Sequence, residues 1–80
     1  MELVVTDRNT TRSFPVAWIE LNTPTGNFVI QTGHAPCFFI LSAGEPIIFR
    51  LRNGKQDAIT VHRGVIEIQR DTATLILDAA

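Results

Sequence analysis

The stretch that decides the fold runs from Gly26 to Leu41 and reads GNFVIQTGHAPCFFIL. It contains two short apolar runs, FVIQ and PCFFIL, on either side of a Gly-His-Ala-Pro sequence. Gly33 permits a tight turn that an L-residue would resist. Pro36 fixes its own φ and pushes Ala35 into an extended conformation. The stretch therefore predicts two β-strands joined by a stiff corner, from which His34 projects.

The same pattern continues in both directions along the chain. Apolar runs rich in Val, Ile, Thr and Phe are broken by turn residues at intervals of about eight to twelve positions, which is typical of all-β sandwiches and barrels. No run has the period of a helix. The sequence predicts a single domain over residues 1–80 with an all-β fold, a small antiparallel β-sandwich. In its first half, strands are expected at Leu3–Thr6, Val16–Leu21, Phe28–Gln31 and Pro36–Leu41.

A first hairpin is expected about Asn53-Gly54, a strong signal for a two-residue type I′ turn. Both of its faces carry apolar residues, which predicts a place inside the sandwich rather than at an edge. The expected cross-strand pairs are Ile48 with Ile59, Phe49 with Ala58, and Arg50 with Asp57, the last being opposite in charge.

A second hairpin is expected to turn at Asp71-Thr72. Its apolar residues alternate with polar ones, so a slip of one residue would turn the apolar set outward. The expected pairs are Ile68 with Leu75 and Ile66 with Leu77 on one face, and Glu67 with Ile76 and Gln69 with Thr74 on the other.

Composition and charge exclude several classes of protein. The net charge of −1 and the scattered distribution of seven basic residues argue against an electrostatically driven nucleic-acid or membrane binder. One cysteine cannot form an internal disulfide, and a reducing compartment fits it best. The first residues do not resemble a signal peptide, and no segment approaches the roughly 20 apolar residues of a membrane span. Any membrane association is expected to come through a partner.

Trp18 has two possible roles. It alternates with Ala17, Ile19 and Leu21 along one expected strand, so either its face or theirs must look outward. Filling the core is the commoner role of a large aromatic residue. On the outer face, Trp18 would instead be a candidate contact residue.

His34 and Cys37 are the candidate chemical residues. Their spacing would suit half of a zinc site, but a structural zinc needs four ligands and the chain has only one other histidine, His62. A Cys–His nucleophile would need a lowered thiol pKa, whereas Cys37 precedes an apolar run that is expected to be a buried strand. The sequence therefore predicts no catalytic residue, no cofactor and no metal, and favours a structural corner whose histidine contacts a partner.

Several motifs, in one order along the chain, resemble the N-terminal β-sandwich of the epsilon subunit of F-type ATP synthases. The Gly26-Asn27-Phe28 turn and the Gly33-His34-Ala35-Pro36 corner resemble that family's corresponding turn and Pro-Gly-His-Ala-Pro-Leu corner. The remaining matching segments are Leu3–Thr6 with Phe14, Ser42–Phe49, Val61–Ile68 and Thr74–Ala80. The resemblance covers almost the whole chain.

The resemblance implies a non-catalytic central-stalk, or rotor, subunit that joins the gamma subunit to the c-ring and couples ion transport to ATP synthesis. It implies a peripheral location on the cytoplasmic face of the bacterial inner membrane, or the equivalent side in an organelle, with membrane association only through the complex and no nucleic-acid partner. The implied ring-facing residues are Thr25, Gly26, Asn27 and Phe28. Those near gamma are Gly33, His34 and Phe39. The ring contact is implied at one end and the gamma contact at another surface, with a rim built from the Gly26–Phe28 turn and the Gly33–Pro36 corner.

Most members of that family continue into a C-terminal helical hairpin that can restrain ATP hydrolysis. This sequence stops at Ala80, where the hairpin would begin, so the polypeptide by itself is expected not to inhibit hydrolysis in that way. Two alternatives remain at this point. One is a small β-sandwich that binds peptides or proteins and is unrelated to ATP synthase, and the other is a thiol- or metal-dependent enzyme centred on His34 and Cys37.

Overall fold

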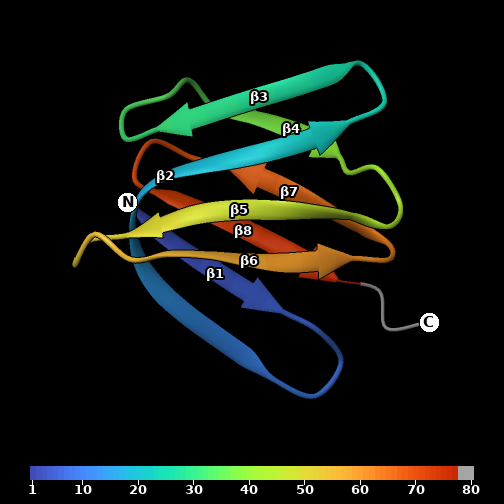
Figure 1. The fold of residues 1–80 in the computed structure, drawn as a ribbon, viewed down its shortest axis with the longest axis horizontal. Helices are drawn as coiled ribbons and strands as arrows, with labels where there is room; N and C mark the ends of the chain where they lie inside the picture. Colours follow the sequence, from blue (N-terminus) through green and yellow to red (C-terminus); the bar gives the residue numbers. More distant parts are fainter. Residues whose placement is uncertain (78–80) are drawn as a thin grey trace.

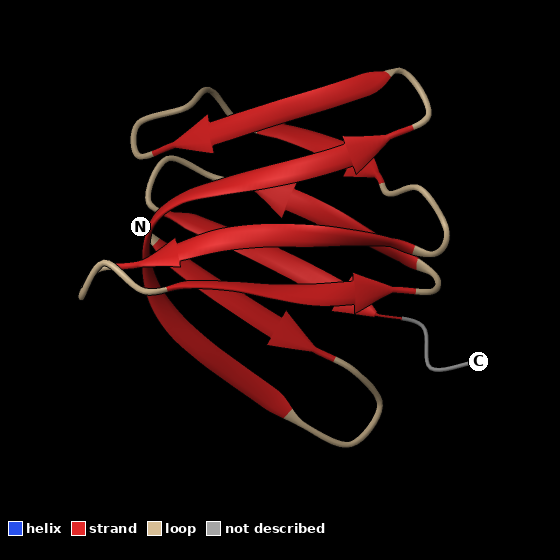
Figure 2. Cartoon of the chain, viewed as in Figure 1, coloured by secondary structure: helices blue, strands red, loops and turns tan. Residues whose placement is uncertain are grey.

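The computed structural model describes residues 1–77 and shows a β-sandwich of two layers, with no helix in that range (Figures 1 and 2). The all-β sandwich expected from the sequence is confirmed. The strands are β1 (Glu2–Thr6), β2 (Thr11–Thr23), β3 (Gly26–Gln31), β4 (Cys37–Ile40), β5 (Glu45–Leu51), β6 (Gln56–Val61), β7 (Gly64–Ile68) and β8 (Thr72–Leu77). The predicted domain and the matching C-terminal segment extend to residue 80, and residues 78–80 lie outside the described range. A helix long and apolar enough to cross a membrane is not found among residues 1–77.

Strand β2 belongs to both layers. Its first segment, from Thr11 to Pro15, pairs with β1 in a first sheet whose order is β4-β7-β8-β1-β2. Its second segment, from Val16 to Thr23, lies between β3 and β5 in a second sheet whose order is β3-β2-β5-β6. The pair β1 and β8 is parallel, whereas the other pairs are antiparallel. The first sheet is therefore mixed rather than wholly antiparallel.

The core lies between the two sheets and is entirely apolar. Alternate residues of each strand point inward, as the period of a β-strand requires, and no polar or charged side chain among residues 1–77 is buried. The buried residues are Met1, Leu3, Val5, Val16, Ile19, Leu21, Ile30, Leu41, Ile47, Phe49, Val61, Ile66, Ile68, Ala73 and Leu75.

A bulge in β2 decides the position of Trp18. The register of β2 against β5 shifts between Val16 and Trp18. The extra residue allows both Val16 and Ile19 to point into the core, although strict alternation would put them on opposite faces. Trp18 is consequently partly exposed on the outer face of the second sheet and is not one of the core residues. The interpretation of Trp18 as a core residue is wrong.

The first hairpin has a three-residue turn rather than a type I′ turn. A type I′ turn needs positive φ at both central residues, but among residues 1–77 only glycines have positive φ, and Gly54 has a φ of 93°. Gly54 N–H donates to Leu51 O (2.9 Å) and Leu51 N–H donates to Lys55 O (2.7 Å). The added turn residue shifts the register by one position, so Ile48 lies opposite Ala58, and the predicted pairing of Arg50 with Asp57 is wrong.

Strand β6 is an edge strand, which contradicts the prediction that the whole hairpin lies inside the sandwich. β5 lies between β2 and β6, and β6 ends the sheet although it too carries apolar residues. On β6, the Asp57 carboxylate accepts a hydrogen bond from Ala58 N–H (2.8 Å). A carboxylate at this place discourages another strand from pairing with the open edge.

The second hairpin has the predicted faces but not the predicted pairs. Gln69 N–H donates to Thr72 O (2.7 Å), so the turn is centred on Arg70 and Asp71. Ile66 lies opposite Leu75, and Ile68 lies opposite Ala73, which is a shift of two positions from the prediction. A shift of two keeps every side chain on its face. The apolar pattern therefore could not distinguish the two registers.

Candidate functional site

The corner between β3 and β4 is held by backbone hydrogen bonds. Gly33 has a φ of 86°, a conformation that L-residues rarely adopt. Its N–H donates to Arg70 O (2.9 Å), which fastens the corner to the β7–β8 turn, and His34 N–H donates to Gln31 O (3.2 Å). Glycine is therefore required here by the backbone, and hydrogen bonds tie the backbone of the corner that carries His34 to its neighbours.

His34 and Cys37 lie close together, but their geometry does not activate the thiol. The Nδ1 atom of His34 is 2.7 Å from Ala35 O and 3.7 Å from Cys37 Sγ. Because a carbonyl oxygen can only accept, Nδ1 must carry the proton and donate to Ala35 O. The nitrogen beside the thiol therefore has no free lone pair with which to take the thiol proton.

Burial raises the pKa of Cys37, which also opposes nucleophilic chemistry. A reactive cysteine needs a lowered pKa, whereas burial disfavours the thiolate of Cys37 and so raises its pKa. Among the described residues, no three His, Cys, Asp or Glu side chains are grouped closely enough to hold a metal ion. The pair is best explained as part of the structural corner.

The Cys37 thiol should react slowly with a thiol reagent such as DTNB. At neutral pH we expect a rate several-fold below that of the same chain in denaturant, because burial disfavours the thiolate. Since the folded-state pKa is raised, folding favours the protonated thiol. This contribution to stability is complete below the unfolded-state pKa and is lost as pH rises through the folded-state pKa. A rapid reaction below pH 7 would contradict the assignment of Cys37 as unreactive.

The structure places the candidate contact residues at two ends of β3. Thr25, Gly26 and Asn27 lie at the β2–β3 turn, whereas Gly33 and His34 lie at the opposite end of the strand (Figure 1). Six extended residues separate the ends by roughly 20 Å. The turn and the corner, from which the contact rim was expected to be built, therefore lie at opposite ends of this strand.

Two of the candidates meet between the sheets. The rings of Phe28 and Phe39 lie 5.0 Å apart, with an angle of 40° between their planes. Phe28 is 37% exposed, and Phe39 packs partly buried against the core. This aromatic pair closes the sandwich on the side where β3 and β4 are the last strands of their sheets.

The side chain of Asn27 is already engaged within the domain. Its Nδ2 atom donates to Glu20 Oε2 (3.2 Å) and to Asn22 Oδ1 (3.0 Å). At the same turn, Thr23 Oγ1 donates to Gly26 O (2.9 Å). These bonds fix the shape of the β2–β3 turn, whose exposed residues include Pro24, Thr25 and Gly26.

An exposed apolar surface on the first sheet was not predicted from the sequence. Phe38, Ile40 and Ile76 are 58%, 65% and 45% exposed, and all three lie on the outer face of the first sheet. Ile40 lies opposite Val65, which lies opposite Ile76, so one apolar row crosses β4, β7 and β8. The strand that begins at Cys37 was expected from the sequence to be buried. It is instead an edge strand, and only Cys37 and Phe39 face the core.

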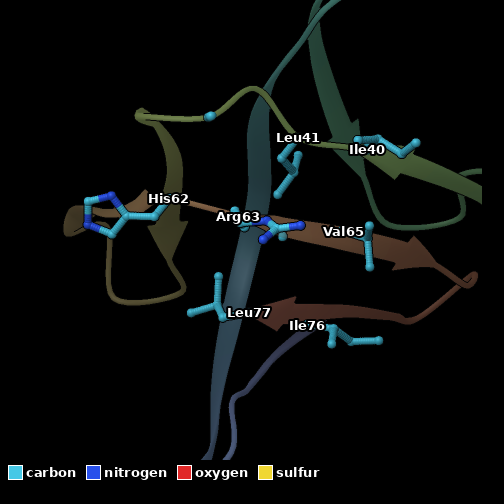
Figure 3. A pocket seen from close by; sticks show the side chains of 9 residues that line it. Ile40, Leu41, His62, Arg63, Val65, Ile76 and Leu77 are labelled. Carbon is cyan, nitrogen blue, oxygen red and sulfur yellow. The ribbon is translucent and has the colours of Figure 1, made fainter. Parts of the chain in front are cut away.

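This apolar row forms one wall of a shallow hollow of about 510 Å³. Figure 3 shows Ile40, Val65 and Ile76 at one side of the hollow and His62 at the other. The signal for this surface was present in the sequence, because a four-residue strand that is apolar at every position has two apolar faces. When such a strand lies at an edge, one of those faces remains uncovered.

The fold and these surfaces define a small β-sandwich with exposed apolar residues and no activated nucleophile among residues 1–77. Comparison with known proteins gives its family. The model of the family described as ATP synthase, Delta/Epsilon chain, beta-sandwich domain matches residues 2–80. The chain belongs to this family, and the resemblance found in the sequence is confirmed.

Known relatives extend this comparison. The ATP synthase epsilon chains of Acinetobacter baylyi and Acinetobacter baumannii are each 38% identical over 55 residues, covering 69% of this chain and 39% of each relative. A chain in the Euglena gracilis mitochondrial ATP synthase structure (OSCP/F1/c-ring) has a TM-score of 0.84 at 20% identity, covering 94% of this chain and 48% of that one. A chain of the Tetrahymena thermophila central stalk/c-ring structure has a TM-score of 0.79 at 17% identity, covering 98% and 63%. The match to the two curated relatives thus spans well under half of their length.

Proposed function

We propose that this β-sandwich is a non-catalytic part of an ATP synthase central stalk, where it joins the gamma subunit to the c-ring. The observation that carries the proposal is the family match over residues 2–80. That match favours a rotor role over an unrelated peptide-binding module. The domain would then work by binding, and it would help to couple ion transport to ATP synthesis without performing chemistry.

The shape of the domain supports two separate contacts. The β2–β3 turn and the His34 corner lie at opposite ends of β3, so one rigid sandwich can reach two different bodies. We assign Thr25, Gly26, Asn27 and Phe28 to the contact with the c-ring. The contact with gamma includes Gly33, His34 and Phe39.

The apolar surface of the first sheet enlarges the proposed gamma contact. Phe38 and Ile40 alternate with Phe39 on β4, and their exposed fractions exceed half. Water-exposed apolar residues grouped in this way mark protein contact surfaces.

The domain would be peripheral, on the side of the membrane where the F1 part of the enzyme lies. We propose more specifically that it lies on the cytoplasmic face of a bacterial inner membrane, or on the equivalent side in an organelle.

A capture experiment tests this function. The tagged chain should retain the gamma subunit and the c-ring from the same source through washes that remove a folded, unrelated β-sandwich. The complex should bury an apolar contact, so raising the salt concentration should weaken capture only slightly. If the folded chain captures neither component, the rotor role is excluded and the family match reflects shared fold alone.

A further inference from the structure

The β5–β6 turn forms a fixed basic tip at one end of the sandwich. Besides its two turn-closing hydrogen bonds, Lys55 N–H donates to Asn53 Oδ1 (2.9 Å). Arg52 N–H donates to Pro15 O (3.2 Å), which ties the turn to β2. In Figure 1 the tip lies at the left, at the end opposite the β2–β3 turn. These bonds hold the backbone of the tip in place before any partner arrives.

Three cations gather at this tip. Arg50, Arg52 and Lys55 are all exposed, and Arg50 Nη2 lies 3.7 Å from the place that a Cβ on Gly54 would occupy. None of the three forms a salt bridge with another residue in the range 1–77. The nearest carboxylate along the chain, Asp57, is hydrogen-bonded to Ala58 N–H. A chain with a net charge of −1 thus has a locally positive end.

Trp18 lies beside one of these cations, Arg50, on the outer face of the second sheet. It is the direct cross-strand neighbour of Arg50 on one side and of Gln31 on the other. The bulge in β2 turns it outward, where it is partly exposed. Tryptophan and arginine are among the residues most enriched at the positions that dominate binding energy in protein interfaces. An aromatic anchor and a group of cations therefore occupy one continuous surface.

We propose that this surface, made by Trp18, Arg50, Arg52 and Lys55, binds an acidic segment of a partner protein that also carries an apolar residue. The carboxylates of the segment would pair with the cations, and its apolar side chain would pack on the indole ring. The surface lies on the sheet opposite to the apolar face of β4, so both contacts can form at once. This inference does not depend on the proposed binding of gamma.

The small number of cations favours a peptide over other anions. Proteins that hold duplex DNA by its phosphates often make about six to ten such contacts. Recruitment to anionic lipids usually takes clusters of about four to eight basic residues. Three cations beside one aromatic ring match a short segment with a few carboxylates. The partly exposed indole adds a surface on which an apolar side chain of that segment can pack.

The single tryptophan provides the test, because its fluorescence reports directly on the proposed surface. The whole chain is titrated with a short peptide of glutamate and leucine, and in parallel with a counterpart in which glutamine replaces glutamate. We expect a saturable change in emission with the first peptide, weakened by salt, and none with the second. The double variant Arg52→Ala/Lys55→Ala should bind about tenfold more weakly.

The matched control is Arg8→Ala/Arg12→Ala, which removes one exposed cation from the β1–β2 loop and one from the start of β2. It should leave the affinity within about twofold of the original, since neither Arg8 nor Arg12 belongs to the proposed surface. An equal loss in both double variants would show that only overall charge matters and would overturn the proposal. The proposal would also be overturned by the absence of any response, by an equal response to the glutamine peptide, or by binding only to vesicles containing phosphatidylglycerol. Because the assay needs neither gamma nor the c-ring, its failure is distinct from failure of the rotor role.

Discussion

Replacing Phe49 by alanine should remove a large part of the stability of this domain. The side chain is 1% exposed at the centre of the core, and its ring lies 5.7 Å from that of Phe14. Truncation of a buried phenylalanine costs about 3–5 kcal/mol, because it loses apolar burial and leaves a cavity. A domain of 80 residues has in total about 4–12 kcal/mol. Urea denaturation followed by circular dichroism should therefore show a much lower midpoint, or a partly unfolded protein without urea.

The control for this experiment is Ile48→Ala on the same strand. Ile48 points to the outer face of the second sheet and is only partly buried. Its truncation leaves no enclosed cavity, so its cost should be less than half that of Phe49→Ala. Equal losses for the two variants would mean that β5 does not divide its faces between core and surface as the structure describes.

The double variant Phe38→Ser/Ile40→Ser should lose capture of the gamma subunit while remaining folded. Both side chains are more than half exposed, so their removal costs little stability. Apolar anchors at protein interfaces contribute about 2 kcal/mol or more each, which is roughly thirtyfold in affinity. We expect the affinity for gamma, measured by surface plasmon resonance, to fall by at least that factor.

Val29→Ser provides a comparison on the other sheet. Val29 is 52% exposed on β3, in the second sheet. The substitution removes a similar exposed apolar group outside the proposed gamma contact, so it should change the affinity by less than about twofold. If Val29→Ser weakens capture more than Phe38→Ser/Ile40→Ser does, the contact lies on the second sheet and the assignment of the apolar row is wrong.

Alternation of apolar residues was sufficient to predict the class of fold and most of the strands, but not the details of pairing. The β5–β6 register depended on the conformation of one turn, where a third turn residue displaced every pair by one position. The β7–β8 register differed by two positions, which leaves the same residues buried. In both cases the apolar pattern records which face of a strand is buried, whereas pairing also depends on the turn.

The sequence predicted only those parts of the candidate site whose conformation depends on residues close together in the chain. The corner at Gly33 and Pro36 depends on neighbouring backbone conformations, and the structure has the expected turn there. The placement of Trp18 depends on a bulge, and the exposure of Ile40 depends on which strand ends the sheet. Such long-range features are set by tertiary packing, and no short pattern in one sequence contains them.

The passage of β2 through both layers has a mechanical consequence. The continuous backbone from Thr11 to Thr23 joins the two sheets. A force that shears one sheet against the other therefore acts on this strand as well as on the apolar contact between the layers. The load passes along covalent bonds and is shared by the hydrogen bonds that link this strand to β1, β3 and β5. Bonds loaded together along the strand direction resist better than bonds opened one after another. The sandwich should therefore transmit torque between its two ends as a single stiff body.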